Sequence, residues 1–276
     1  MGNWSDRTTL RDEAGDVVLV FSASESTRES IPWADGVWVP PSVPIIDAVG
    51  RALDAMPGWR FSTSDRSLAR AMLAAGARQR RHAHIMTTSS PEPPPPAPDV
   101  ATDSGLRVEP LTAAQVDRHA LALGALSYRA YPAEHPDAFD GDEAAAISQV
   151  RAIARGEMLG PLMSESRVAL VDGRIVGACL VVDRPGAPPY GGPWVIDVFR
   201  DPSSPVRGVG TAMLADVLRA AREAALPGLS LTVSHDNRPA RRLYRRLGLT
   251  EVDESWTLAL PKEDERPASV RSSRGT

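Results

Sequence analysis

The residues best suited to chemistry begin within residues 198–214, which read VFRDPSSPVRGVGTAML. A β-rich run leads there into an Arg-Gly-Val-Gly turn, and a helical pattern follows at once. Gly208 and Gly210 have no Cβ, so the backbone can bend tightly and approach a ligand. The first N–H groups of a helix lack partners within the helix and therefore attract anions. With Arg207 beside them, these groups predict a phosphate-binding site.

This turn does not fit the two common nucleotide-binding motifs. It lacks the lysine of the GxxxxGK[ST] loop and the third glycine of the dinucleotide fingerprint. A different phosphate-bearing cofactor is therefore expected. The alternative is that Gly208 and Gly210 serve only the geometry of a strand-to-helix connection.

A second motif occupies residues 237–249, NRPARRLYRRLGL. Pro239 suits the first turn of a helix, and Gly248 suits its end. The helical spacing predicts one buried face formed by Ala240, Leu243, Tyr244 and Leu247. Packing on that face explains neither the hydroxyl of Tyr244 nor the amide of Asn237. These two polar groups are therefore candidates for chemistry.

Together, the two motifs and the hairpin and strand before them resemble the GNAT superfamily of N-acetyltransferases over residues 106–260. The resemblance implies that the glycine turn holds the pyrophosphate of acetyl-CoA. It also implies that the preceding strand diverges from its neighbour and leaves backbone groups for the pantetheine arm, and that an asparagine lies near the cofactor. The implied cofactor contacts are Val198, Phe199, Arg200, Val206, Arg207, Gly208, Val209, Gly210, Thr211, Ala212 and Asn237.

Catalytic roles follow from the same resemblance. Transfer to an amine requires a base that removes a proton and benefits from an acid that protonates the departing thiolate. The resemblance implies Tyr244 as the acid and Asp197 as the base, acting through water. Asp197 could instead be solvated at the sheet surface or bonded to a loop, and His235 or Asp236 could serve in its place.

One position departs clearly from the family pattern Q/RxxGxG. Pro205 stands where glutamine or arginine is usual, and proline offers neither charge nor an N–H group. Either cofactor binding is weakened, or Arg207 and the neighbouring amides suffice. Leu249 in place of phenylalanine is a milder change.

The order of β-rich and helical runs predicts an α+β fold, a sheet with helices on its faces. The resemblance to GNAT proteins implies that this sheet is mixed and mostly antiparallel. The pattern Arg167 to Val182, with Asp172-Gly173 between two β-rich runs, predicts a hairpin. Strands are expected at 106–110, 167–171, 175–182, 194–199, 229–233 and 256–260, and helices at 113–130, 142–155, 208–225 and 239–247.

Four segments are expected along the chain. Residues 1–88 form a smaller N-terminal α/β domain, 89–104 a Pro-rich linker, 105–260 the catalytic domain and 261–276 a disordered tail. The linker contains SSPEPPPPAPD, which could alternatively be a ligand for a partner that binds proline-rich segments.

The N-terminal domain resembles a degenerate half of the same fold, in a layout similar to tandem members of the family such as mycothiol synthase. Alignment of Gly76 with Gly248 places Asp65 opposite Asn237 and Met72 opposite Tyr244. Residues 40–42, Pro-Pro-Ser, replace the glycine turn. This domain therefore lacks both the phosphate cradle and the acid.

Composition narrows the function further. The chain has 31 basic and 35 acidic residues and a net charge of −4, which disfavours nucleic acid as a general partner. Cys179 is the only cysteine, so an internal disulfide is impossible and nothing suggests a Cys-based metal cluster; we expect no metal cofactor. No apolar run suits a membrane span, and no secretory signal begins the sequence, so we expect a cytoplasmic protein.

We therefore expect an enzyme that moves an acetyl or related acyl group directly from acyl-CoA to a primary amine of a small molecule or peptide. It would act as a monomeric pseudo-dimer or as a homodimer. The alternative is a noncatalytic acyl-CoA sensor or partner-binding module, and a nucleic-acid binder built on the arginines of residues 238–246 ranks third. Candidate acceptor-binding residues are Tyr128, Tyr131, His135, Asp137 and the loop 188–193.

Overall fold

The computed structural model describes residues 7–25, 31–88, 105–138 and 141–265. The expected linker at 89–104 and the tail from residue 266 onward lie outside these described residues. Residues 261–265, which we expect from the sequence to lack structure, include the 3-10 turn Glu263–Glu265. Glu265 accepts a hydrogen bond there from Arg78 at 3.0 Å. Among the described residues, no helix is long and apolar enough to cross a membrane.

The chain divides into two compact units. Unit 1 takes its residues from Met1–His84 and Asp253–Thr276, and unit 2 is Ile85–Val252. Two long strands, β5 (Arg78–Thr88) and β11 (Thr250–Ala259), therefore contribute residues to both units. This division differs from the boundaries expected at residues 88 and 105, because strand pairing, rather than chain order, decides where the last strand belongs.

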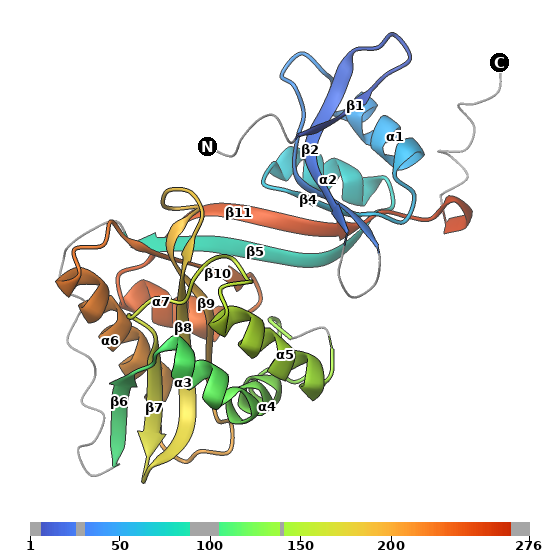
Figure 1. Cartoon of the computed structure of the whole chain (residues 1–276). Coiled ribbons are helices and arrows are strands. Elements are labelled where there is room, and N and C mark those ends of the chain that lie inside the picture. Colours follow the sequence, from blue (N-terminus) through green and yellow to red (C-terminus); the bar gives the residue numbers. More distant parts are fainter. Residues whose placement is uncertain (1–6, 26–30, 89–104, 139–140, 266–276) are drawn as a thin grey trace. The chain divides into compact units, whose positions relative to one another are not determined.

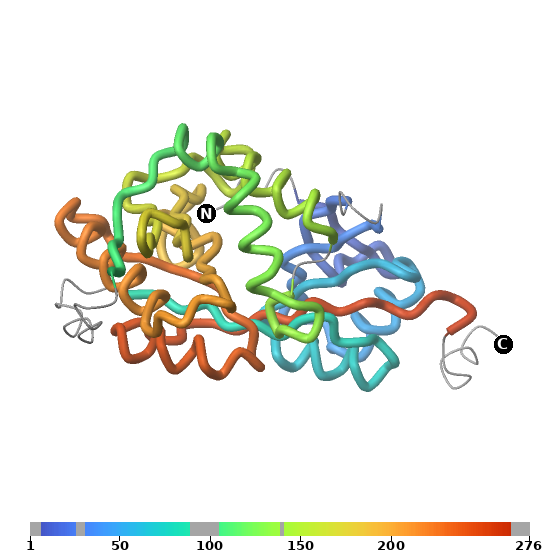
Figure 2. Tube along the Cα trace, turned by 90° about the horizontal axis from the view of Figure 1, so that it is seen from below, coloured from blue at the N-terminus to red at the C-terminus, as the bar shows by residue number. Residues whose placement is uncertain are grey.

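Unit 1 contains a sheet with two helices. The strand order is β1-β2-β3-β4-β11-β5, and β11 pairs antiparallel with β4, so that Trp256 lies opposite Thr63. Figure 2 shows the C-terminal strand in red beside the residues of β5. The remaining elements are β1 (Thr8–Arg11), β2 (Val17–Glu25), β3 (Pro32–Trp38), α1 (Ile45–Ala55), β4 (Arg60–Thr63) and α2 (Arg66–Ala74).

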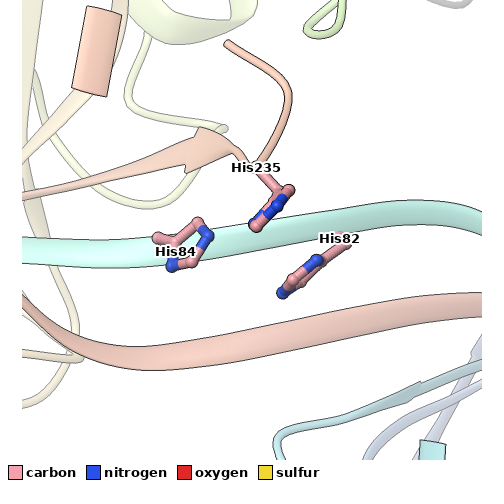
Figure 3. Close-up of side chains that lie close together, drawn as sticks. All are labelled: His82, His84 and His235. Carbon is pink, nitrogen blue, oxygen red and sulfur yellow. The ribbon is translucent and has the colours of Figure 1, made fainter. Parts of the chain in front are cut away.

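Strand β5 presents two histidines within unit 1. His82 and His84 are two residues apart, so their rings leave the strand on the same side, with centroids 5.1 Å apart (Figure 3). The ring of His82 stacks on Trp256 of β11 at 4.7 Å. Its Nε2 lies 2.8 Å from Oε2 of Glu254. Trp256 thus belongs to the core of unit 1, together with Phe61 and Leu258.

Unit 2 has the strand order β5-β10-β9-β8-β7-β6, in which residues 85–88 of β5 form one edge. The expected helix 113–130 is interrupted at His119, which ends α3 and precedes α4. The elements are β6 (Leu106–Pro110), α3 (Ala113–Arg118), α4 (Ala120–Ala130), α5 (Glu143–Ala154), β7 (Arg167–Val171), β8 (Arg174–Arg184), β9 (Gly192–Arg200), α6 (Val209–Glu223), β10 (Leu229–Ser234) and α7 (Arg238–Arg246).

The sheet of unit 2 is covered on both faces. Along β8, Cys179 and Val181 pack with the core of α6 and α7, whereas Ala178 and Leu180 pack with α3, α4 and α5. This alternation follows from the two-residue period of a strand. Figure 1 shows the two groups of helices on opposite sides of the strands. The α+β fold expected from the sequence is therefore confirmed.

The two units repeat one local topology. In unit 2, β9 is parallel to β10 and lies beside an irregular antiparallel pairing with β8. In unit 1, β3 is parallel to β4 and lies beside an irregular antiparallel pairing with β2. Each parallel pair continues into a helix capped at its N-terminus by a side chain, Asp65 on α2 and Asn237 on α7. Unit 1 thus has the layout of the second half of unit 2.

Candidate active site

The central feature of unit 2 is the point where β9 and β10 part. Their parallel pairing joins Trp194 to Ser230 and Val195 to Leu231, and among the described residues it ends there. The pairing of β9 with β8 shifts register at the next residue, because Asp197 lies opposite Leu180 while Val195 lies opposite Val181. The extra residue is a β-bulge, a feature that bends a strand and redirects its groups.

The bulge leaves backbone groups on the β10 side of β9. Asp201 donates its N–H to the carbonyl of Val176 across the β8–β9 pair at 2.7 Å. Hydrogen-bonded and non-hydrogen-bonded pairs alternate along an antiparallel ladder. Val198, opposite Cys179, therefore turns its N–H and C=O away from β8. Its C=O accepts instead from the hydroxyl of Tyr131 at 2.6 Å, and its N–H donates to the carboxylate of Asp197.

Helix α6 begins beside this strand with unsatisfied donors. Gly208 precedes the helix in a left-handed conformation, φ 79°, which favours glycine. The N–H of Ala212 makes the first helical bond, to the carbonyl of Gly208 at 2.8 Å. No side chain of the described residues caps the helix, so the N–H groups of Val209, Gly210 and Thr211 have no intrahelical partner.

Glycine is required at Gly177 of β8, which faces α6, but not by packing at Gly210 in the first turn of α6. A Cβ on Gly177 of β8 would lie 2.8 Å from the carbonyl oxygen of Phe199 and 2.9 Å from Cε of Met213, so this glycine allows α6 to pack closely on the sheet. A Cβ on Gly210 would meet nothing within 4 Å. Packing within the described protein therefore does not require Gly210, and the first turn of α6 stays open to a ligand.

The other residues of the predicted cradle vary in exposure. Val206 is half-buried and packs on the α6 core, whereas Arg207 and Pro205 are exposed. Phe199 is buried beneath α3, α4 and α5. Arg200 is exposed and donates to the carbonyl of Asp201 at 3.2 Å. The structure thus brings the predicted cradle residues to one region, the end of β9 and the start of α6.

Asp197 lies on the bulged strand with two hydroxyl donors. Ser127 donates to its Oδ2 and Tyr131 to its Oδ1, each at 3.0 Å. Burial raises the pKa of Asp197 to about 6, against the hydrogen bonds from Tyr131 and Ser127, which lower it. A carboxylate that titrates near neutrality can take up a proton during a reaction. Asp197 is therefore not a solvated surface residue.

Tyr244 is buried on the inner face of α7, as its spacing predicts. Burial raises the pKa of its hydroxyl, and the nearby Cys179, Asp137 and Asp197 raise it further. No hydrogen bond joins this hydroxyl to another residue in the described part of the chain. Tyr244 therefore keeps its proton at neutral pH and can donate it to a ligand.

Asn237 has an additional structural role that its motif does not predict. Its Oδ1 accepts from the N–H of Ala240 at 3.2 Å and caps α7. Its Nδ2 donates to Oδ2 of Asp137 at 2.8 Å. Oδ1 of Asp137 accepts from the N–H and the hydroxyl of Ser234, at 3.0 and 2.6 Å. These bonds tie the segment after α4 to the start of α7.

A buried ion pair holds α6 against the sheet. Nε of Arg167 on β7 lies 2.5 Å from Oδ2 of Asp216, and the Arg167 side chain is 6% exposed. Burial alone would raise the pKa of Asp216, but hydrogen bonds from Arg219 and Arg167 lower it overall. Both guanidinium groups therefore favour the ionised carboxylate, and the Arg167 pair ties the middle of α6 to β7.

Several other candidates are exposed or bonded within the protein. Asp236 is exposed, and the carbonyl of His235 accepts from Arg241 at 2.9 Å. Arg241 and Arg245 bind Glu251, so part of the arginine-rich helix α7 is engaged within the protein. Tyr128 is exposed on α4.

In unit 1, the start of α1 differs from that of α6. The N-cap is Pro44, and Asp47 lies in the first turn. Pro40, Pro41 and Pro44 have no N–H to offer, and the charge of Asp47 repels an anion. This helix start is therefore unsuited to a phosphate.

Comparison with known proteins agrees with the fold. Residues 125–249 match the model of the acetyltransferase (GNAT) family. A GCN5-related N-acetyltransferase from Sphaerobacter thermophilus superimposes with a TM-score of 0.63 at 18% identity, covering 95% of this chain and 81% of that one. A tandem GNAT protein from the clavulanic acid biosynthesis pathway gives 0.55 at 15% identity, covering 92% and 82%.

A GNAT-family acetyltransferase from Colwellia psychrerythraea gives a TM-score of 0.56 at 9% identity, covering 90% of this chain and 83% of that one. A sequence comparison with curated proteins gives no match. The matched segment lies within unit 2 and contains the bulged strand, α6 and α7. This segment therefore matches the GNAT family that its two motifs resemble.

Proposed function

We propose that unit 2 transfers an acyl group from acyl-CoA to a primary amine of a small molecule or peptide. The observation that carries this proposal is the uncapped start of α6 together with the end of the β9–β10 pairing at Val195, just before Asp197, whose charge also acts on Tyr244. The match of residues 125–249 to the GNAT family supports acyl transfer in general.

The start of α6 suits the pyrophosphate of acyl-CoA. The N–H groups of Val209, Gly210 and Thr211 are free to donate, and the open space at Gly210 lets an anion approach them. Hydrogen bonds to charged groups are worth about 1.5–3 kcal/mol each. These three amides and the exposed Arg207 would therefore hold the phosphates despite Pro205, while the N–H groups of Val206 and Ala212 are already bonded, to Ser204 and Gly208.

The open side of β9 suits the pantetheine arm. The C=O of Val198 faces that side and can accept from an amide of the arm in place of the hydroxyl of Tyr131, while the N–H of Val198 donates to Asp197. By the same alternation the backbone groups of Arg200 also face that side, whereas those of Phe199 face β8. Asn237 is already bonded to Ala240 and Asp137, so we propose that it supports the site mainly by fixing α7.

The reaction needs a neutral amine and a protonated leaving group. The amine nitrogen attacks the thioester carbonyl, and its surplus proton passes to Asp197 directly or through water. The C–S bond then breaks, the amide forms, and the hydroxyl of Tyr244 protonates the CoA thiolate. Cys179, the only cysteine, is buried, so transfer proceeds without an acyl-cysteine intermediate.

A noncatalytic acyl-CoA sensor is the second candidate, because Pro205 removes a donor from the cradle. Thiol release from acetyl-CoA across a panel of amines, amino acids and peptides separates the two. An enzyme releases thiol only with an acceptor, and Tyr244→Phe lowers its kcat while CoA affinity stays unchanged. CoA binding without thiol release for any acceptor would instead support the sensor.

The proposal extends to the setting of the enzyme. Unit 1 lacks the cradle and would serve as a degenerate partner domain within a monomeric pseudo-dimer, or the chain would form a homodimer. We propose a cytoplasmic location and no requirement for a metal ion.

A further inference from the structure

The hydroxyl of Tyr131 reaches two acceptors on β9. It lies 2.6 Å from the carbonyl oxygen of Val198 and 3.0 Å from Oδ1 of Asp197. A hydroxyl has a single proton, so a full hydrogen bond to one acceptor weakens the bond to the other. Burial and the charge of Asp197 raise the pKa of Tyr131, which therefore remains a donor at neutral pH.

The two acceptors have different parts in the proposed function. The carbonyl of Val198 faces the open side of β9, where an amide N–H of the acyl-CoA arm would donate. Asp197 is the proposed base. The shorter distance shows that Tyr131 binds mainly the Val198 carbonyl in this structure.

We propose that Tyr131 is a positioning residue that couples occupancy of the Val198 carbonyl by acyl-CoA to the hydrogen bonding of Asp197. This inference rests on the proposed function of unit 2. A ligand N–H that donates to Val198 competes with Tyr131 for that oxygen, and Tyr131 then donates more fully to the carboxylate. Donation to the ionised form stabilises it, so the base is deprotonated more readily once the thioester is bound.

Other groups near Asp197 act differently. Ser127 of α4 donates to Oδ2, a side-chain atom that no backbone-binding ligand of β9 would displace. Asp137, in the segment after α4, raises the pKa of Asp197 through its negative charge. Tyr244 of α7 and Cys179 of β8 stay protonated, because burial raises the pKa of each group. Ser127→Ala is therefore the matched control for Tyr131→Phe.

The test is a carbon-13 NMR titration of the Asp197 carboxyl in the full chain, with and without CoA. In the ligand-free state, Tyr131→Phe and Ser127→Ala both raise the pKa of Asp197, because each removes a donor. CoA lowers this pKa in the wild type and in Ser127→Ala but not in Tyr131→Phe. A CoA response in Tyr131→Phe equal to that of the wild type would overturn the proposal.

Kinetics provide a second readout that a purely structural role would not change. The pH profile of kcat/KM reports the free enzyme and that of kcat the bound complex. In the wild type the acidic limb of kcat lies at lower pH than that of kcat/KM for acetyl-CoA, and in Tyr131→Phe the two limbs coincide. If the wild type binds no CoA, the proposed function fails as well. If the wild type binds CoA and releases thiol but its kcat and kcat/KM profiles have the same acidic limb, the proposed function stands and only the coupling role of Tyr131 is contradicted.

Discussion

The side-chain amide of Asn237 joins two parts of unit 2, because its nitrogen donates to Asp137 at 2.8 Å while its oxygen caps α7. We predict that Asn237→Ala lowers the free energy of unfolding by about 1–2 kcal/mol, since it removes a helix cap and leaves Asp137 short of a donor. Urea denaturation measures this loss. The exposed neighbour provides the control, and Asp236→Ala should stay within about 0.5 kcal/mol of the wild type. Reduced CoA affinity in Asn237→Ala at unchanged stability would instead assign the amide to the cofactor.

We predict that the buried carboxylate of Asp197 lowers the stability of the protein at neutral pH. Its pKa in the folded protein is about 6, above the ordinary value of 3.8. Its contribution to stability is therefore complete below pH 3.8 and is lost as the pH rises through 6. Asp197→Asn stays neutral, so we predict that it is more stable than the wild type at pH 8 by about 1–3 kcal/mol, and that this difference vanishes in acid.

The same substitution should lower kcat by about 100-fold, because a general base contributes about that much or more. Urea denaturation at several pH values and thiol-release kinetics check both results. In the wild type, kcat/KM should fall below about pH 6. A variant that is less stable than the wild type at pH 8, or that keeps full activity, would exclude Asp197 as a strained base.

The two glycines of the turn should respond differently to alanine. Gly208 has φ 79°, so Gly208→Ala strains the backbone and costs about 1 kcal/mol. Gly210→Ala fills open space in the first turn of α6 and should leave stability unchanged or raise it by up to about 1 kcal/mol. We predict that Gly210→Ala nevertheless weakens CoA binding at least tenfold. Thermal denaturation and calorimetry separate the effects, and unchanged CoA affinity would mean that Gly210 serves only the turn.

The buried ion pair predicts a contrast between two arginines. Arg167→Met leaves Asp216 partly buried without its inner partner and should destabilise the protein by about 3 kcal/mol. Arg219 is 52% exposed, so Arg219→Gln should cost less than about 1 kcal/mol. Urea denaturation of both variants decides this, and equal losses would contradict the packing described for α6.

Local patterns predict the elements whose signals lie within a few residues. The alternation of residues along β8 is sufficient to predict that strand, and Pro239 and Gly248 are sufficient to predict the ends of α7. Both signals lie within a single segment and do not depend on distant residues. The break at His119 carries no glycine or proline, so no local signal predicts it. The first half of β11, TEVDES, has no apolar pattern and is equally unpredictable, since strand pairing rather than burial holds it.

The contacts around the base cannot be read from local spacing. Ser127 and Tyr131 reach Asp197 across 70 and 66 residues of sequence. The sequence makes Tyr131 only a positional candidate for the acceptor site, and nothing in it singles out Ser127. Asp137 is likewise a candidate by position, but its bonds to Ser234 and Asn237 depend on how the segment after α4 packs. Such long-range pairs arise from tertiary packing, which one sequence does not encode in any periodic form.

The most direct test of the central claim is a calorimetric titration of the purified full chain with CoA and acetyl-CoA. We predict saturable binding of both ligands by the wild type, at one site per chain. Gly210→Leu, whose side chain enters the open first turn of α6, should lose this binding while remaining folded. Absence of binding by the wild type, or equal binding by Gly210→Leu, would contradict the assignment of α6 as the acyl-CoA site.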